Sequence, residues 1–484
     1  MGNKRELFLE KIASGQNFAL RFDLVNGWNG RIFHLGIAEK LLPFLRVAGV
    51  KFFELGSLSA VDHTSFKSIS IFAKEPQLIA DEMFEKIGFK GDRTSPRLSL
   101  INAAVQHCID NKDHELLSSF VEFEQRNNYW LQNYALFVAL SKYIGTNEFF
   151  SWPEGIGNYE RKLLGIASKQ LFDKIIFEKT TQFLTHLSLK NFTERAKQLG
   201  IFVGGTVNVL CEEFSSEVWG NQKLFFLNKL NRATVYNGLP VNKYLEHGLK
   251  SSQVPYRWSE MYGNNYELIH NLFRSQEEVF DYAYLMNGHT IFHYWEIPNF
   301  ETNGEHGRWV PTKSELFFEY TKPHFDQFPF IFDFNDPLSP KHALLARRHN
   351  LLRAVIQGEP ETHAYEKYDL SAEIKILASK RCNGKLPLSK ALIQSILSEA
   401  KTNLASMLEK KYPIKLIHIE EVCSILGVSI ADIANKPEYY GEIFGNILAG
   451  KPTFTKKSRK SVNFPFEKEK KSILQSIAAL FLKK

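Results

Sequence analysis

Few residues of this chain combine a reactive side chain with a spacing that would let it do chemistry. His289 and His293 stand four positions apart, which on a helix would put two zinc ligands on one face. Their segment leads directly into a strand-like run, which argues against a metal role. The cysteines are widely spaced and form no CxxC pair, namely Cys108, Cys211, Cys382 and Cys423. We therefore expect reduced structural thiols, no metal and no other cofactor.

The charge pattern argues against nucleic acid as a partner. The chain of 484 residues has a formal net charge of +7. Residues 451–484 contain ten Lys or Arg and two Glu, a net charge of +8, so residues 1–450 have a net charge of −1. The basic character belongs to a tail, and the body is neutral. The sequence also lacks a phosphate-binding loop, a dinucleotide-binding glycine pattern and a GxSxG motif.

The elements that must position any site alternate along the chain. Short runs rich in β-branched and aromatic residues cover residues 50–58, 200–210, 281–288 and 328–334. Longer amphipathic stretches separate these runs, which predicts an α/β architecture. Between the first two runs, residues 76–199 have a mainly helical pattern and in a barrel would form an inserted subdomain.

The last third of the chain has a different character. Residues 346–450 have helical patterns, for example at 389–408 and 417–426, with fewer strand-like runs. Residues 451–484 begin as a basic linker and end as an amphipathic helix, which we place at 468–484. Such a helix must dock on its own barrel, bind a partner's groove or lie on a membrane surface.

Four stretches, in order along the chain, resemble the amylomaltases, the 4-α-glucanotransferases of glycoside hydrolase family 77. Residues 29–79 follow the family's pattern of a GIGDLG turn, a WQVLPLGP strand and an SPYQS loop. The other three contain WLQNYALF at 130–137, SSEVW and PYRW between 200 and 258, and YWEIP and GRW between 280 and 309. Their order and near-constant spacing argue against a chance match. The resemblance implies a (β/α)8 TIM-type barrel over residues 1–345, with 346–450 as its helical, diverged C-terminal part.

The resemblance also implies chemistry by two carboxylates. Retaining transfer between glucans needs one carboxylate to attack the anomeric carbon and a second, about 5 Å away, to protonate the leaving oxygen. The family's nucleophile is the aspartate of an RIDHF motif, and that position falls on Met286. Tyr284 and Asn287 stand at the arginine and histidine positions of the motif. A thioether cannot form the glycosyl ester, so this position is inactive.

The general-acid position, a glutamate in the family, falls on Asp333 within FPFIFDFND. This carboxylate is one methylene shorter, and a displacement of about 1 Å can cost about a hundredfold in rate. We interpret Asp333 as a remnant general acid; the alternative is that it caps a strand end or turn. The family's third acidic residue would fall near Cys382 and Asn383, where no acid stands.

The positions that the resemblance assigns to sugar binding are Phe66, Asn242, Tyr256 and Trp258. Other polar contacts of the family have given way to apolar or small residues, which would leave sugar hydroxyls without partners. We interpret the retained aromatic residues as core rather than as a sugar platform. These residues are Trp130, Tyr134, Trp219, Trp258 and Trp295.

We therefore expect an amylomaltase-like protein of α-glucan metabolism that has lost catalysis and acts as a scaffold or weak glucan binder. One alternative is an active 4-α-glucanotransferase, and another is an interaction protein with no link to carbohydrate. The expected partners are an α-glucan and a protein bound through the helix at 468–484. Neither a signal-peptide core nor an apolar run of transmembrane length occurs, which predicts a cytoplasmic protein.

Overall fold

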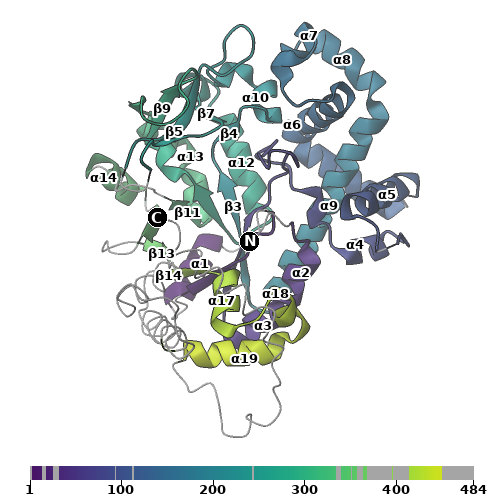
Figure 1. Ribbon diagram of the computed structural model, residues 1–484, viewed down its shortest axis with the longest axis vertical. Helices are drawn as coiled ribbons and strands as arrows, with labels where there is room; N and C mark the ends of the chain where they lie inside the picture. Colours follow the sequence, from purple (N-terminus) through teal and green to yellow (C-terminus); the bar gives the residue numbers. More distant parts are fainter. Residues whose placement is uncertain are drawn as a thin grey trace, which may run out of the picture.

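A computed structural model describes residues 3–13, 18–25, 32–92, 94–111, 114–242, 245–333, 340–349, 351–356, 363–367, 395 and 414–449. Eight strands form a barrel. They are β1 (Phe18–Arg21), β2 (Phe52–Ser57), β3 (Phe202–Asn208), β8 (Tyr282–Met286), β11 (Phe330–Asp333), β12 (Leu352–Ile356), β13 (His363–Lys367) and β14 (Ile414–His418). Strands β3, β11, β13 and β14 are labelled near the centre of Figure 1.

The eight strands pair in the order β1-β14-β13-β12-β11-β8-β3-β2 and close as a barrel, with every pair parallel. The predicted α/β class with a curled parallel sheet is confirmed, and each predicted strand run contains a barrel strand. The described part of residues 346–450 contributes three strands that were not predicted, β12, β13 and β14, and it also contains helices, as predicted. The segments after β12 and β13 lie largely outside the described residues, so the complete set of eight strand–helix repeats stays a prediction.

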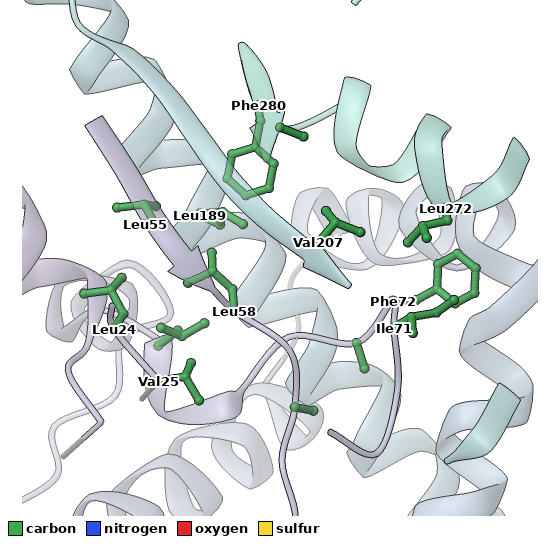
Figure 2. Close-up of a cluster of buried hydrophobic side chains, with 14 of the residues drawn as sticks. Leu24, Val25, Leu55, Leu58, Ile71, Phe72, Leu189, Val207, Leu272 and Phe280 are labelled. Atoms are coloured by element: carbon green, nitrogen blue, oxygen red, sulfur yellow. The ribbon is translucent and has the colours of Figure 1, made fainter. Parts of the chain in front are cut away.

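Alternating residues of the strands point into the barrel and out toward the helices. Phe52, Tyr282 and Ile331 belong to the inner cluster, whereas Phe53 and Leu285 belong to the large outer core. Both faces of a parallel barrel are covered, so its strands carry apolar residues on both sides. Figure 2 shows part of the outer core, in which side chains of β2 and β3 meet side chains of the surrounding helices. The labelled side chains are Leu24, Val25, Leu55, Leu58, Ile71, Phe72, Leu189, Val207, Leu272 and Phe280.

Helix α1 (Lys4–Ala13) covers the end of the barrel at which the strands begin. The Phe8 ring lies 5.1 Å from that of Phe52 and 5.3 Å from that of Tyr282. Lys4 Nζ donates to the backbone oxygens of Glu277 and Phe280, at the end of a neighbouring helix. The apolar face of α1 thus fills the barrel, while its basic residues satisfy carbonyl groups that a helix end leaves open.

Helices join β1 to β2 and β2 to β3. After β1 come α2 (Leu35–Lys40) and α3 (Leu42–Ala48). After β2 come η2 (Pro76–Leu78), α4 (Asp81–Lys86), α5 (Arg97–Asp110), α6 (His114–Ile144), η3 (Phe149–Ser151), α7 (Glu154–Gly157), α8 (Arg161–Gln170) and α9 (Phe172–Gln198). The helices after β2 fall within the stretch predicted to be helical, 76–199, and lie to the right of the barrel in Figure 1. The limits of an inserted subdomain stay a prediction.

Further elements connect the strands from β3 to β11. Between β3 and β8 lie β4 (Cys211–Glu212), α10 (Ser216–Gly220), η4 (Gln222–Leu224), β5 (Val235–Leu239), β6 (Leu249–Lys250), β7 (Gln253–Val254), α11 (Trp258–Gly263) and α12 (Glu267–Glu277). Between β8 and β11 lie η5 (Gly288–Ile291), β9 (His293–Pro298), β10 (Arg308–Pro311) and α13 (Ser314–Gln327). Strands β10, β9, β5 and β6 form a second sheet in that order, and β4 pairs with β7.

The last described helix packs against a helix near the start of the chain. After β11 comes α14 (Pro340–Arg348), and after β14 come α17 (Ile419–Leu426), α18 (Ile430–Asn435) and α19 (Pro437–Leu448). Helix α19 packs on α3, with the rings of Phe44 and Phe444 stacked at 5.7 Å. A Cβ atom at Gly441 would lie 2.8 Å from the backbone oxygen of Phe44, so only glycine permits this approach.

Two predictions cannot be compared with the structure. The tail at 451–484, with its helix at 468–484, and the segment around Cys382 lie outside the described residues. Within the ranges that are described, no helix is both long enough and apolar enough to cross a membrane. The cytoplasmic location stays a prediction.

Candidate functional site

The two predicted catalytic positions lie on neighbouring barrel strands. Met286 is the last residue of β8 and Asp333 the last residue of β11, and these strands pair with Tyr284 opposite Ile331. Both positions are therefore at the carboxyl ends of the strands, the end that carries the active site in barrels of this type. The Met286 side chain is half-buried. For Asp333 the structure describes only the backbone, so its role as a general acid stays a prediction.

Carboxamide side chains stand beside Met286. Asn208, the last residue of β3, is directly opposite Met286 in the strand pairing. Its Oδ1 atom accepts a hydrogen bond from Asn287 Nδ2 at 3.4 Å and another from Leu210 N at 3.1 Å. Asn287 has a left-handed backbone, with φ of 59°, a conformation that asparagine tolerates better than most residues. These groups can bind hydroxyls, but neither amide can act as a nucleophile.

A buried ion pair at the same end of the barrel was not predicted. Glu54 of β2 is 0% exposed, and its Oε1 atom lies 3.1 Å from a terminal nitrogen of Arg21, the last residue of β1. The same oxygen accepts a hydrogen bond from Thr206 Oγ1 on β3 at 2.6 Å. The face of the Tyr284 ring lies 5.8 Å from the Arg21 guanidinium carbon. Three adjacent strands and β8 thus supply one polar network inside the barrel.

Asp23 extends this network toward the surface. Its Oδ1 atom accepts from Arg21 Nε at 2.9 Å, and its Oδ2 atom lies 3.6 Å from His418 Nδ1. Gly56 makes room for Asp23, because a Cβ atom at Gly56, where φ is +67°, would lie 2.0 Å from Asp23 Oδ1. Only a glycine meets both conditions.

The electrostatics of the network keep Arg21 charged. Burial would by itself lower the pKa of Arg21, but the carboxylates of Glu54 and Asp23 more than offset that effect and raise the pKa above its ordinary value. A buried guanidinium with two carboxylates is the arrangement in which charges can be held away from water. The network can therefore hold its polar side chains in fixed orientations at the carboxyl ends of the strands, which we call the mouth of the barrel.

The sequence contains only a faint signal for this network. Glu54 interrupts an otherwise apolar run, FFELG, and Arg21 ends another, FALR. An acidic residue in a strand buried on both faces requires a partner. The partners, Arg21 and Thr206, are 33 and 152 positions away along the chain, so sequence spacing alone could not identify them.

The predicted sugar-binding residues are in different environments. Phe66 is 47% exposed and has a positive φ of 56°, which is unusual for an aromatic residue and costs backbone energy. Asn242 is exposed on a loop. Tyr256 is 1% exposed and its hydroxyl donates to the backbone oxygen of Val209 at 2.7 Å, so its ring offers no open face to a sugar.

The aromatic residues interpreted as core divide into two groups. Trp130, Tyr134 and Trp219 are buried, as expected for core residues. Trp258 is half-buried, and its ring contacts those of Tyr256 and Phe317, each with centroids 6.0 Å away. Trp295 is also half-buried and lies on β9. The interpretation as core therefore holds fully for the first group only.

The pair His289 and His293 does not lie on a helix face. His289 is buried in η5, His293 begins β9, and their ring centroids are 6.5 Å apart. Throughout the described part of the chain, no three or more His, Cys, Asp or Glu side chains are grouped so that they could hold a metal ion. Cys108, Cys211 and Cys423 are free thiols in buried positions.

Comparison with known proteins identifies the family. The family profile described as 4-alpha-glucanotransferase, glycoside hydrolase family 77, matches residues 30–333. The 4-alpha-glucanotransferase of Thermus thermophilus is 26% identical over 330 residues, which are 65% of this chain and 66% of that protein. The 4-alpha-glucanotransferase of Aquifex aeolicus is 24% identical over 312 residues, 61% of this chain and 63% of that protein. Each alignment spans just under two thirds of the relative's length.

Solved amylomaltase structures have the same fold. The amylomaltase of Streptococcus agalactiae, determined in complex with acarbose, superposes with a TM-score of 0.74 and 15% identity, covering 90% of this chain and 99% of that chain. The amylomaltase of Corynebacterium glutamicum superposes with a TM-score of 0.59 and 12% identity, covering 90% of this chain and 66% of that chain. The profile match extends over more than half of the residues and ends at the last residue of β11. This chain belongs to the 4-alpha-glucanotransferase (amylomaltase) family, glycoside hydrolase family 77.

Proposed function

We propose that this chain binds α-1,4-glucan but does not transfer glucan segments at the rate of a 4-α-glucanotransferase. The observation that carries the proposal is the methionine at the end of β8. A retaining mechanism needs a carboxylate that forms a covalent bond to the anomeric carbon. The thioether of Met286, in the position that the resemblance gives to that carboxylate, cannot form the bond and later release it to an acceptor.

The polar network in the barrel supports the same conclusion. The carboxylates of Glu54 and Asp23 both bind Arg21, and Glu54 also accepts from Thr206. Both carboxylates are thus already engaged by a cation and by hydrogen bonds within the barrel. A nucleophile has to be free to form a bond to the anomeric carbon. We therefore infer that neither carboxylate replaces the one that is missing at Met286.

The second candidate is an active 4-α-glucanotransferase. The comparisons favour it, because the matched family profile and both relatives carry that name. In this reading Asp333 would act as the general acid. A nucleophile would have to come from a residue other than Met286.

Incubation with maltotriose separates the two candidates. We expect the purified full chain to produce neither longer nor shorter maltooligosaccharides, with the Thermus thermophilus relative as the positive control. Calorimetry with maltoheptaose should still show binding. Disproportionation at a rate close to that of the relative would overturn the proposal and establish the second candidate.

The variant Met286→Asp examines the same position directly. We expect it to restore little activity, because the neighbouring Tyr284 and Asn287 also differ from the family and grouped catalytic residues act together. The matched control is Met286→Leu, which should leave glucan binding unchanged. Substantial transfer by Met286→Asp would show that the remainder of the site is intact.

A further inference from the structure

A row of aromatic rings lies on the hairpin formed by β9 and β10. This hairpin belongs to the connection that leaves the carboxyl end of β8 and leads, through α13, to the start of β11. In Figure 1, β9 lies with β5 at the upper left of the view. Connections at this end of a barrel are the ones that contact ligands.

Strand pairing places the rings next to one another. Trp309 on β10 is directly opposite Trp295 on β9, and their ring centroids are 5.3 Å apart. His293 is two residues before Trp295 and therefore on the same face of the strand. Its ring centroid is 4.7 Å from that of Trp309. His342 of α14 stacks on His293 at 5.2 Å with an interplanar angle of 15°.

The neighbouring contacts hold this row in place. Trp295 Nε1 donates to the backbone oxygen of Gly304 at 3.0 Å. A Cβ atom at Gly307 would lie 2.4 Å from that nitrogen, so the backbone passes close to the indole edge. Beside the tryptophan pair, Arg308 Nε donates to Glu296 Oε1 at 2.8 Å and joins the two strands a second time. The aromatic row is thus part of a rigid hairpin.

Trp309 is the member of the row that faces solvent. It is 42% exposed, which for a side chain of this size corresponds to roughly 100 Å². The rings of His293 and Trp295 both meet Trp309 at steep angles, 74° and 67°. Single exposed apolar side chains are common on protein surfaces, but this indole is held in place by two further rings.

We propose that Trp309, supported by Trp295 and His293, is a stacking platform for a glucose ring of an α-glucan, separate from the end of β8. The proposal rests on the glucan binding proposed above. A pyranose has an apolar face of C–H groups that matches one face of an indole, and its hydroxyl edge stays in water. A neutral sugar also suits this surface, because the charges of the adjacent Arg308 and of Glu296 are paired with each other.

Alanine substitution of Trp309 tests the platform. Calorimetry of the full chain with maltoheptaose should show that Trp309→Ala weakens binding by about tenfold or more, because an aromatic stacking contact contributes on the order of that factor. Trp309→Phe retains a ring and should weaken binding less. Phe300→Ala is the matched control, because Phe300 is 78% exposed on the turn of the same hairpin; it should bind like the unmodified chain.

Three outcomes would contradict the proposed platform. If the unmodified chain and Trp309→Ala bind maltoheptaose equally, the platform is wrong and glucan binding elsewhere stands. If the unmodified chain binds neither maltoheptaose nor glycogen, the platform and the glucan-binding part of the proposed function both fail. If Trp309→Ala changes only the sedimentation of the protein, the exposed indole is a contact between protein chains. A thermal melt of each variant shows whether it is folded.

Discussion

The two ends of the barrel interior differ in chemistry although the same strands form both. At the end where the strands begin, Phe8 of α1 fills the space between Phe52 and Tyr282. At the other end, two residues further along β2, Glu54 binds Arg21. One end is closed by apolar packing and the other by charges held in hydrogen bonds. The difference shows that apolar packing closes the end where the strands begin, whereas hydrogen bonds and ion pairs fix the side chains at the other end.

A substitution at the apolar end of the barrel should have the largest effect on stability. Phe8→Ala should lower the free energy of unfolding by about 3–5 kcal/mol, because it leaves a cavity among rings that cannot collapse into it. Chemical denaturation measures the effect. Leu7→Ala is the matched control: Leu7 is 49% exposed on the same helix, and its loss should change the stability by no more than about 0.5 kcal/mol. Equal effects of the two variants would mean that α1 does not fill the barrel.

The charged end should respond differently to single and double substitutions. Glu54→Leu leaves Arg21 buried with Asp23 alone and should cost about 3 kcal/mol of unfolding free energy. Adding Arg21→Met should recover most of that loss, since replacing a whole buried pair by apolar residues is often neutral. A double variant as unstable as Glu54→Leu would show that the network is required for the fold itself. Recovery of stability in the double variant would indicate that the network is not needed for folding and instead orients side chains at the mouth of the barrel.

A third region, the helices after β2, contains a titratable ring beside several cations. This ring belongs to His186 of α9. Burial, together with Lys190, Arg126 and Lys74, lowers the pKa of His186 to about 4. The folded state therefore favours the neutral ring. Its contribution is complete above the ordinary pKa of about 6.5 and is lost as the pH falls from there toward 4.

Stability as a function of pH tests this point. The loss from His186 should amount to about 2–3 kcal/mol between pH 6.5 and 4. In His186→Phe, whose ring can keep the contact with Phe123 at 5.1 Å in the native chain, the decline should be shallower. Measurement at pH 8 provides the reference, where the protonation of His186 no longer contributes. Parallel pH profiles for the two proteins would contradict the prediction.

Much of the fold could be predicted from local pattern. The runs at 50–58, 200–210, 281–288 and 328–334 contain β2, β3, β8 and β11, because strands buried on both faces are rich in β-branched and aromatic residues. β1, β12, β13 and β14 were not predicted. The last three lie in a stretch where the helical patterns at 389–408 and 417–426 dominated the prediction. Short strands acquire their identity from the neighbours with which they pair.

The order and spacing of motifs along the chain were enough to predict the family and the barrel class, and they located the residues at the ends of β8 and β11. The folded structure was needed to show that Glu54 meets Arg21 and Thr206, that Tyr256 is buried, and that Trp309 is exposed beside Trp295. The reason is physical: side chains that are distant in sequence meet through strand register, and register is set by the whole barrel. The burial of a side chain and its contacts therefore depend on the whole barrel and cannot be inferred from one segment.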